Sequence, residues 1–576
     1  MLPTTHWENS YADGKAQEAL AKELGIHPIL SRILLNRNIS TTKKAKKFLF
    51  PSLRDLHNPF LMKDMEDGVD RVMKAIREGE KVVIYGDYDA DGITSTVLLV
   101  KFLRYLQVNT SYYIPDRIRD GYGLHKEALD SIKAGGTDLI ITVDCGISDN
   151  EEVTYANSLG IDTIILDHHE VPERMPEAVA VIDPHRRDCD FPFKHLAGVG
   201  VAFNFLIALR GSLRNIGFWK DGKYPNLRKY LDLVALGTIG DVVPLVDENR
   251  IFAKIGMATI NEGKNIGLRA LRSTSGMEGK TIDSGAASFN LIPRINAAGR
   301  VGSPEDAVQL LLTEDTETAL RLSERLNAYN KERQEIERII VEEILHEIKV
   351  TTRNEDIKSF VFASHRWHPG VIGIVASKIV DRYYRPTILI SLKNGIGKGS
   401  GRSISTFNLY RSLEEKCASL LLSFGGHQHA AGITIREEDI EHFSQILDAT
   451  VRDELDDSDF TKKTAIDAEC TMEDITYDLI SQIEMLSPFG NMNPEPILCT
   501  KKVRVSSLQM VGNNHLKMNM KKSGLSYDSI WFNKGHFANT LAKSTVDIAF
   551  TPQINNWRGT STIQLKLKDI SKHIQS

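Results

Sequence analysis

Three short apolar segments, each followed within two residues by an acidic side chain, constrain the fold of this chain more than any other feature. They are residues 82–85 (VVIY), 139–143 (LIITV) and 161–166 (IDTIIL), and stretches with a helical pattern separate them. Short continuous apolar strands that alternate with helices predict a parallel sheet with helices on both faces. Because functional groups gather at the carboxyl ends of such strands, we expect the acids that follow them to lie together.

With 576 residues, the chain is too long for a single hydrophobic core. A stretch rich in Glu, Arg and Leu, from about 316 to 350, predicts a long helix, and its lack of sustained heptads favours a connector. Near the end of the chain, Leu516, Met518 and Met520 alternate with polar residues, which predicts a small antiparallel barrel. We expect five parts: an N-terminal helical segment (1–65), an α/β domain (66–250), a helical linker (251–350), a second α/β domain (351–455) and a barrel (461–576).

The charge is distributed unevenly along the chain. The net charge is −5, yet residues 501–576 carry twelve Lys and Arg against three Asp. An acidic body with a basic final segment predicts that this end meets a polyanion, although a solvated basic surface is the simpler alternative.

The sequence also bears on location. No apolar run approaches the about 18 residues that a membrane span needs, and the first residues lack the apolar stretch of a secretory signal. Five cysteines without CxxC spacing favour a reducing compartment, so we expect a cytoplasmic protein without membrane contact.

The segment GDYDADG follows the first apolar strand and brings Asp87, Asp89 and Asp91 close together. Three neighbouring carboxylates need a positive partner, and a divalent cation is the usual one. Gly92 would fit a calcium loop, but Leu98 stands where an EF-hand has its Glu, which excludes that reading. Alone, an acidic turn is more often a solvated loop, so the assignment depends on the other strand ends.

Those strand ends supply further ligand types. Asp144 follows the second strand, Asp167, His168 and His169 follow the third, and Asp241 lies in TIGDVVP. Adjacent histidines point to different sides, so one can bind a metal while the other faces a substrate. Carboxylates with one or two imidazoles suit Mn²⁺ or Mg²⁺ better than zinc. Two such ions, about 3.5–4 Å apart, would clamp a phosphoryl group.

Taken in order, these segments resemble the four signature motifs of the DHH phosphoesterase superfamily. In the second half, residues 425–432 (GGHQHAAG) resemble the GGHxxAAG signature of its companion DHHA1 domain. Together with residues 367–379 (WHPGVIGIVASKI), residues 293–300 (PRINAAGR) and the barrel, the resemblance is to the RecJ family of single-strand-specific 5′ exonucleases. It extends roughly from residue 50 to the end, and the four motifs in order are highly specific.

The resemblance implies a fold class and a metal site. The expected fold is α/β, with a DHH and a DHHA1 lobe that have parallel-sheet cores, a long helix joining them, and a C-terminal OB-like β-barrel. It implies that Asp87 supports the site, that Asp144 bridges two ions and that His169 contacts the scissile phosphate. Many relatives have a ligand histidine where this chain has Tyr85. The implied metal ligands are Asp89, Asp91, Asp144, His168 and Asp241.

The resemblance also implies a phosphate pocket in the second lobe. Ser400 and Arg402 of GSGRS match the family's 5′-phosphate site, Arg294 or Arg300 would assist, and His427 would contact the substrate. Glycines let backbone N–H groups approach an anion, and a guanidinium pairs with phosphate through two hydrogen bonds. The alternatives are that the glycines only shape a turn and that the histidine only packs.

The barrel offers aromatic rings among basic residues, a combination that holds single strands without sequence preference. Tyr527, Trp531, Phe532 and Trp557 are the rings, and any small barrel buries about half of such residues. We expect Lys517, Lys521, Lys522 and Arg558 to matter more than any one ring.

The implied function is hydrolysis of single-stranded DNA from its 5′ end to mononucleotides, with two Mn²⁺ or Mg²⁺ ions, in DNA repair and recombination. Single-stranded DNA is the expected partner of a monomeric chain, with a single-strand-binding protein and a helicase as further partner classes.

Three alternatives remain. They are a superfamily enzyme for cyclic dinucleotides or short oligonucleotides, a pyrophosphatase, and an inactive nucleic-acid-binding subunit. The basic C-terminal segment argues against the first two, and the nearly complete ligand set argues against the third.

Overall fold

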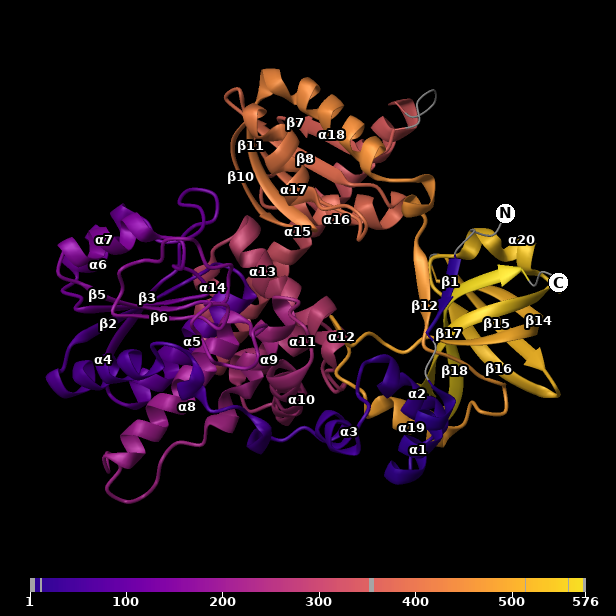
Figure 1. Cartoon of the computed structure of the whole chain (residues 1–576), viewed down its shortest axis with the longest axis horizontal. Helices are drawn as coiled ribbons and strands as arrows, with labels where there is room; N and C mark the ends of the chain where they lie inside the picture. The colour runs from indigo at the N-terminus through magenta and orange to yellow at the C-terminus, as the bar shows by residue number, and fades with distance from the viewer. Residues whose placement is uncertain (1–5, 11–12, 352–356, 513, 558, 573–576) are drawn as a thin grey trace. The chain divides into compact units, whose positions relative to one another are not determined.

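The structure is a computed structural model that describes residues 6–10, 13–351, 357–512, 514–557 and 559–572 (Figure 1). The chain forms two compact units. The larger, which we call the two-lobe unit, comprises Leu56–Val243 and Ile251–Phe460. The other, the barrel unit, combines Met1–Asp55, Pro244–Arg250 and Thr461–Ser576.

The first lobe contains a five-stranded sheet in which every pairing is parallel, as the sequence predicts. Its order is β3-β2-β4-β5-β6, and the three predicted apolar strands are β2, β4 and β5. Helices lie on both faces, with α6 and α7 above the sheet and α4 and α8 below it in Figure 1. The bounds are α4 Met65–Glu78, β2 Lys81–Gly86, α5 Ala90–Tyr105, β3 Asn109–Tyr113, α6 Lys126–Ala134, β4 Leu139–Val143, α7 Asn150–Ser158, β5 Asp162–Leu166, β6 Ala180–Ile182 and α8 Gly198–Asn215.

Helices connect the two lobes. The predicted long helix is confirmed as α15, Thr316–Thr351, whose 36 residues span about 54 Å. The preceding helices are α9 Leu231–Gly240, α10 Asp247–Glu262, α11 Ile266–Thr274, α13 Ile292–Val301 and α14 Pro304–Leu312.

The second lobe is also α/β, with the sheet order β10-β11-β9-β8-β7. Only β7 and β8 pair in parallel, and the other pairings are antiparallel. The expected α/β lobe is therefore confirmed, but its sheet is mixed rather than wholly parallel, because hairpins join the glycine-rich strands. The bounds are β7 Phe360–Ser364, α16 Ile372–Tyr383, β8 Thr387–Lys393, β9 Ile396–Arg402, β10 Leu421–His427, β11 Ala430–Arg436 and α18 Ile440–Glu454.

The barrel unit confirms the predicted β-barrel. Its strands follow the order β14-β15-β16-β18-β17, and pairing of β14 with β17 closes the ring. Leu516, Met518 and Met520 are buried while their neighbours are not, so the alternation of two marks the inner face. The bounds are β14 Leu498–Val511, β15 His515–Lys522, β16 Leu525–Trp531, β17 Thr545–Trp557 and β18 Thr560–Lys572.

The start of the chain belongs to the same unit. Strand β1 (His6–Asn9) pairs in parallel with β12 (Lys463–Ile466), and helices α1 to α3 share one hydrophobic core with the barrel. A strand pairing across some 450 residues leaves no local sign in the sequence. The helices are α1 Gly14–Leu24, α2 Pro28–Asn36 and α3 Thr42–Leu49.

Among the described residues, no helix combines the length and the apolar character that crossing a bilayer requires.

Candidate active site

The loop after β2 is fixed by its own backbone. Asp89 caps α5, and its Oδ1 accepts hydrogen bonds from the N–H groups of Asp91 and Gly92. A Cβ at Gly92 would lie 2.5 Å from the carbonyl oxygen of Asp87, so only glycine permits this tight turn. The turn directs its carboxylates toward the carboxyl edge of the sheet, where the strand pattern predicts them.

Helix α13 holds this loop in place. The N–H of Ala90 donates to Oδ1 of Asn296 on α13 at 2.7 Å, and Gly299 of the same helix packs against the carbonyl of Tyr88. The segment PRINAAGR therefore positions the acidic loop, a role for its Asn and Gly that sequence reasoning missed.

The first turn of α8 orients Asp91. Its carboxylate accepts the N–H of Gly198 at 2.7 Å and the N–H of Val199 at 2.9 Å. A Cβ at Gly198 would lie 2.9 Å from Cβ of Asp144, so a glycine is required where this helix approaches the site. The segment GVGVAF carried this signal, and sequence reasoning did not use it.

The five proposed ligands and Asp87 come together in one cluster. Nε2 of His168 lies 3.1 Å from Asp144, 3.6 Å from Asp241 and 3.8 Å from Asp91. Three sets of side chains can each place ligand atoms within 4.8 Å of one another: Asp91 with His168 and Asp241, Asp87 with Asp89 and Asp144, and Asp144 with His168 and His169. The sets overlap at Asp144 and His168, as expected where neighbouring ions share ligands.

The electrostatics of this carboxylate cluster fit divalent cations. Burial and mutual repulsion raise the pKa of Asp87 and the pKa of Asp144 well above their usual range. The same two causes raise the pKa of Asp91 and the pKa of Asp241, each to about 7. Oδ1 of Asp87 is buried without a hydrogen-bond partner. So many buried carboxylates lack compensating charge, and hard oxygen ligands suit Mn²⁺ or Mg²⁺.

The two adjacent histidines differ in charge. Burial and the neighbouring His169 lower the pKa of His168, which leaves a neutral imidazole of the kind that binds metals. Burial opposes the charge on His169, yet Asp167, 2.7 Å from its Nδ1, raises the pKa of His169 to about 9. Asp167 is itself held by the N–H of Ile147 at 3.0 Å. The structure thus brings together one neutral and one cationic imidazole.

Tyr85, which stands where many relatives have a histidine, faces away from the carboxylate cluster. Its hydroxyl donates to the carbonyl of Gly123 at 3.0 Å, and its ring stacks on Tyr113 within the apolar core below α6 and α7. The position is therefore part of the core.

Arginines line the neighbouring surface, and one of them was missed in the sequence. Arg117, in the loop after β3, lies 5.0 Å above the ring of Tyr88, and its charge acts on Asp87, Arg300 and Arg402. Burial and Arg117 lower the pKa of Arg402 and also that of Arg300, the latter to about 10. The signal available was that β3 ends at the same sheet edge as the acidic strands.

These guanidinium groups form what we call the arginine cluster, Arg117, Arg300 and Arg402. Among the described residues, no carboxylate lies within 4 Å of any of the three. Nη1 of Arg402 donates to Oγ of Ser400 at 3.2 Å, and a Cβ at Gly373 on α16 would meet that oxygen. Gathered cations without carboxylate partners are stabilised by an anion such as phosphate.

The other predicted substrate contacts, His427 and Arg294, lie outside the arginine cluster. His427 is exposed and lies level with Arg402 on the same sheet face, with Ala430 of β11 between them. Gly432 stands directly beside Ser400, and its Cβ position is open space. Arg294 instead donates to Asn327 and to the carbonyl of Asn290.

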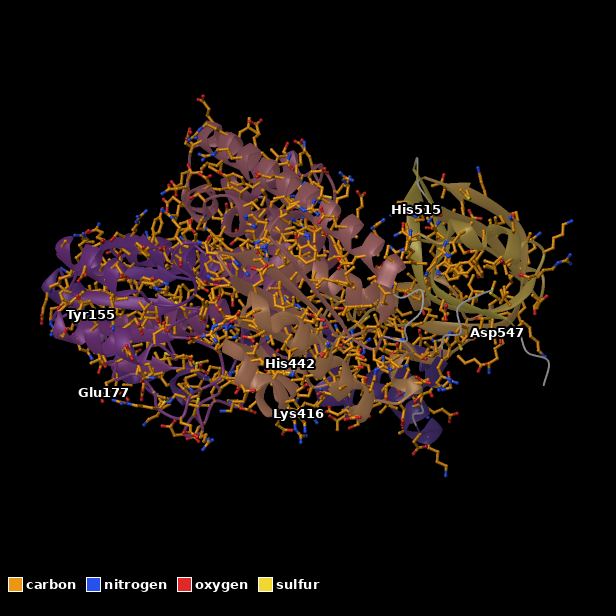
Figure 2. The ribbon with its side chains drawn as sticks, turned by 90° about the horizontal axis from the view of Figure 1, so that it is seen from above. Tyr155, Glu177, Lys416, His442, His515 and Asp547 are labelled. Atoms are coloured by element: carbon orange, nitrogen blue, oxygen red, sulfur yellow. The ribbon has the colours of Figure 1, made fainter. Side chains whose placement is uncertain are left out.

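The barrel offers a nucleic acid exposed basic groups more than exposed aromatic rings. Trp531 is only 2% exposed and belongs to the core, as expected for about half of the rings in a small barrel, so it is no stacking platform. Phe532 is 44% exposed and packs edge-on against His515, which Figure 2 labels. Arg504 and Lys521 are exposed directly opposite each other on β14 and β15, a like-charge pair that a polyanion would stabilise. The side chain of Trp557 and residue Arg558 lie outside the described residues.

Three family descriptions match successive parts of the chain. Residues 81–238 match the DHH family, N-terminal domain, residues 356–453 match the DHHA1 domain, and residues 466–569 match the RecJ OB domain.

Relatives match over nearly the whole length. The single-stranded-DNA-specific exonuclease RecJ of Bacillus subtilis (strain 168) is 39% identical over 568 residues, covering 98% of this chain and 70% of that protein. The protein of the same name from Escherichia coli (strain K12) is 36% identical over 557 residues, covering 94% and 96%.

Solved structures of RecJ also superpose on this chain. The crystal structure of RecJ in complex with Mn²⁺ from Thermus thermophilus superposes with a TM-score of 0.84 at 28% identity, covering 99% of this chain and 80% of that one. The complex with Mg²⁺ from the same source gives 0.79 at 27% identity, covering 99% and 79%.

Proposed function

The chain belongs to the RecJ family of single-stranded-DNA-specific exonucleases, and from this premise we propose that it degrades single strands from the 5′ end and releases mononucleotides. It is a metal-dependent phosphodiesterase that uses Mn²⁺ or Mg²⁺. One observation carries the proposal: the arginine cluster lies close enough to the buried carboxylate cluster for their charges to interact, Arg117 with Asp87 and Arg300 with Asp89. Repair and recombination are the processes that consume such 5′ ends.

In the proposed site, each residue has a distinct task. Bound there, the ions activate water and stabilise the charge that develops on the phosphoryl group. His168 stays neutral and turns its Nε2 to the carboxylates, whereas Asp167 holds Nδ1 of His169 and leaves its Nε2 for the scissile phosphate. The 3′ oxygen is the leaving group. The ligands that would hold two ions are Asp89, Asp91, Asp144, His168 and Asp241, with Asp87 in support.

The arginine cluster would set the polarity. Arg402 with Ser400, together with Arg300 and Arg117, would bind the terminal 5′ phosphate beside the carboxylate cluster. Charge-assisted hydrogen bonds from guanidinium groups suit a phosphate, and a fixed terminal phosphate places the next phosphodiester at the ions. His427 on the same sheet face would contact the incoming strand.

One time course tests this proposal. The chain is incubated with Mn²⁺ and, in parallel, with 5′-labelled and 3′-labelled single-stranded DNA, duplex DNA and a cyclic dinucleotide. We expect labelled mononucleotides first from the 5′ label and none from the Asp89→Ala or His168→Ala variants, which should still bind single strands. Release from the 3′ label first would contradict the polarity, and wild-type rates in either variant would contradict the site.

We also propose the partners, the location and the DNA-binding part of this enzyme. An enzyme limited to single strands depends on an activity that opens duplexes, so we propose a helicase and a single-strand-binding protein as partners of a monomeric chain. A cytoplasmic location is supported by five cysteines that are buried free thiols. The division into five parts stays a prediction, and the exposed pair Arg504 and Lys521 supports residues 461–576 as the DNA-binding part.

A further inference from the structure

A second cavity lies between the first lobe and the connecting helices, at the far ends of two helices whose near ends contribute to the carboxylate cluster. It has a volume of about 860 Å³. Helix α5 begins at the cap residue Asp89 and ends at Tyr105, which lines the cavity. Helix α9 lines it with its first residues and ends at Asp241. From Asp91 to Lys101 the helix rises about 15 Å, so this cavity is distinct from the catalytic site.

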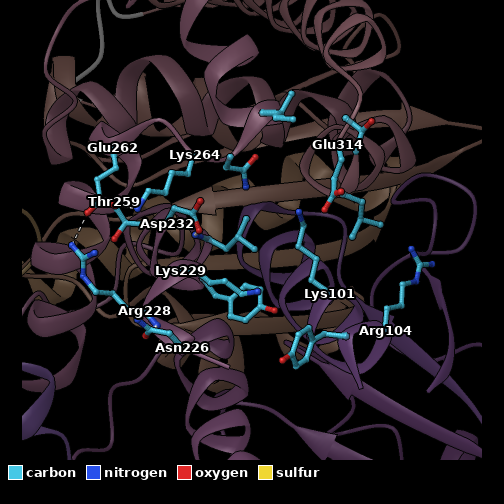
Figure 3. A pocket seen from close by; sticks show the side chains of 17 residues that line it. Lys101, Arg104, Asn226, Arg228, Lys229, Asp232, Thr259, Glu262, Lys264 and Glu314 are labelled. Carbon is cyan, nitrogen blue, oxygen red and sulfur yellow. Dashed lines mark hydrogen bonds and ion pairs between the residues drawn. The ribbon is translucent and has the colours of Figure 1, made fainter. Parts of the chain in front are cut away.

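The lining of the cavity has an excess of cations. Five basic side chains and three carboxylates face it. Glu262 pairs with Arg228 at 2.7 Å and with Lys264 at 2.8 Å, so these charges compensate one another at one side of the cavity (Figure 3). The remaining charged groups are Lys101, Arg104, Lys229, Asp232 and Glu314.

Two of these lysines are available to a ligand. Within the described part of the chain, neither Lys101 nor Lys229 has a carboxylate within 4 Å. Lys229 lies over the rings of Tyr105, at 5.3 Å, and Tyr230, at 4.7 Å. Burial lowers the pKa of Lys101, although Asp232 and Glu314 oppose the shift. A half-buried ammonium such as that of Lys101, without an ion pair, is stabilised by an incoming anion.

The remaining lining suits the rest of a nucleotide. The volume falls in the range of about 300–1,000 Å³ of small-molecule sites, well above the need of a lone phosphate. Tyr105 is 47% exposed and offers a ring for stacking. Asn226, Thr259 and Asn265 add hydrogen-bonding side chains at the rim.

We propose that this cavity binds a nucleoside 5′-monophosphate, with its phosphate at Lys101 and Lys229 and its base against Tyr105. If the proposed function holds, such a compound is the enzyme's own product. The ligand would contact both helices that carry carboxylates of the catalytic centre.

The test is direct binding of thymidine 5′-monophosphate to the full chain, measured by titration calorimetry in EDTA so that no ion bridges the nucleotide to the carboxylate cluster. Because no turnover is involved, the result is independent of the exonuclease assay. Three variants are compared: Lys229→Gln, Lys101→Met, and Arg402→Gln as the control for the arginine cluster. Melting curves and circular dichroism verify that each variant folds.

Because the arginine cluster would also bind a 5′ phosphate, we expect the Arg402→Gln variant to keep one nucleotide site, the cavity. Each lysine substitution should weaken binding at the cavity about tenfold or more, as for loss of a charge-assisted hydrogen bond. Thymidine should not compete. Three results would overturn the proposal: unchanged affinity in both lysine variants, loss of affinity only in Arg402→Gln, or no saturable binding. Equal competition by inorganic phosphate would overturn the nucleotide assignment.

Discussion

At the scale of single residues, the site depends on two adjacent histidines with opposite charge states. His168 is neutral among the carboxylates, and His169 is cationic because Asp167 holds its Nδ1. An imidazolium with a pKa of about 9 is protonated throughout the neutral range, so it can pair with phosphate at any physiological pH.

Replacing Asp167 should therefore change the pH dependence of the reaction. In Asp167→Asn, the pKa of His169 falls toward the ordinary value of about 6.5, so the cation is lost as pH rises through neutrality instead of through about 9. We expect kcat/KM at pH 8 to fall about 100-fold, with a smaller loss at pH 6. Profiles between pH 6 and 9.5 with Mg²⁺ measure the effect. Unchanged Mg²⁺ affinity is the control, and identical profiles would contradict the assigned role.

At the scale of elements, the strands of the first lobe could be predicted because β2, β4 and β5 are continuous apolar runs, and α15 because its helical pattern is long. The acids at the strand ends follow from sheet geometry, as does their clustering. Arg117 and the N–H groups of Gly198 and Val199 were missed although the end of β3 and the segment GVGVAF offered signals, because these groups reach the site only through the packing of a loop and a helix. Tyr85 shows the same limit of sequence reasoning. The sequence indicated only that a metal-binding histidine of many relatives is missing there, whereas the fold shows that Tyr85 is part of the core.

Helix α8 offers a matched pair of glycines for testing that packing. A Cβ at Gly198 would lie 2.9 Å from Asp144, whereas nothing lies within 4 Å of a Cβ at Gly211. We expect Gly198→Ala to destabilise the chain by about 1–3 kcal/mol and to lower Mn²⁺ affinity at least tenfold, because Asp144 and Asp91 must move. Gly211→Ala should keep full activity and gain up to about 1 kcal/mol. Melting temperature and metal titration distinguish the two, and equal behaviour would contradict the assigned packing.

Strand β11 allows a similar test of the phosphate pocket. A Cβ at Gly432 would lie about 5 Å from that of Ser400 and would meet nothing within 4 Å, so the position accepts a side chain. We expect Gly432→Val to lower the preference for 5′-phosphate over 5′-hydroxyl ends about tenfold, measured as the ratio of kcat/KM values. Thr434→Val, on the same face two residues along, is the control. A retained preference in Gly432→Val would argue against phosphate binding there.

At the scale of the whole molecule, the first and last parts of the chain form one unit. Leu30, Ile33 and Leu34 of α2 are fully buried in the core that they share with the barrel. A deletion of the barrel alone would expose this apolar surface, so the N-terminal segment and the barrel have to be removed together.

A comparison of two truncations tests this division. Residues 56–460 should be monodisperse and should still cleave a short oligonucleotide with Mn²⁺, whereas residues 1–460 should aggregate. The shorter chain should bind long single strands more weakly and with a reduced salt dependence, because barrel contacts such as Arg504 and Lys521 are lost. Light scattering and binding at two salt concentrations measure these effects. Equal affinity with an unchanged salt slope would contradict the role given to the barrel.

The pairing of β1 with β12 also sets the order in which a newly made chain can fold. His6 to Asn9 leave the ribosome well before their partners Lys463 to Ile466, which are made some 450 residues later. At about 5–20 residues per second, that separation corresponds to roughly 20–90 seconds, during which the two-lobe unit is synthesised. During that interval the apolar faces of α1 to α3 lack their core, which makes them natural sites for a ribosome-associated chaperone. A strand that is synthesised early is therefore among the last to reach its native state.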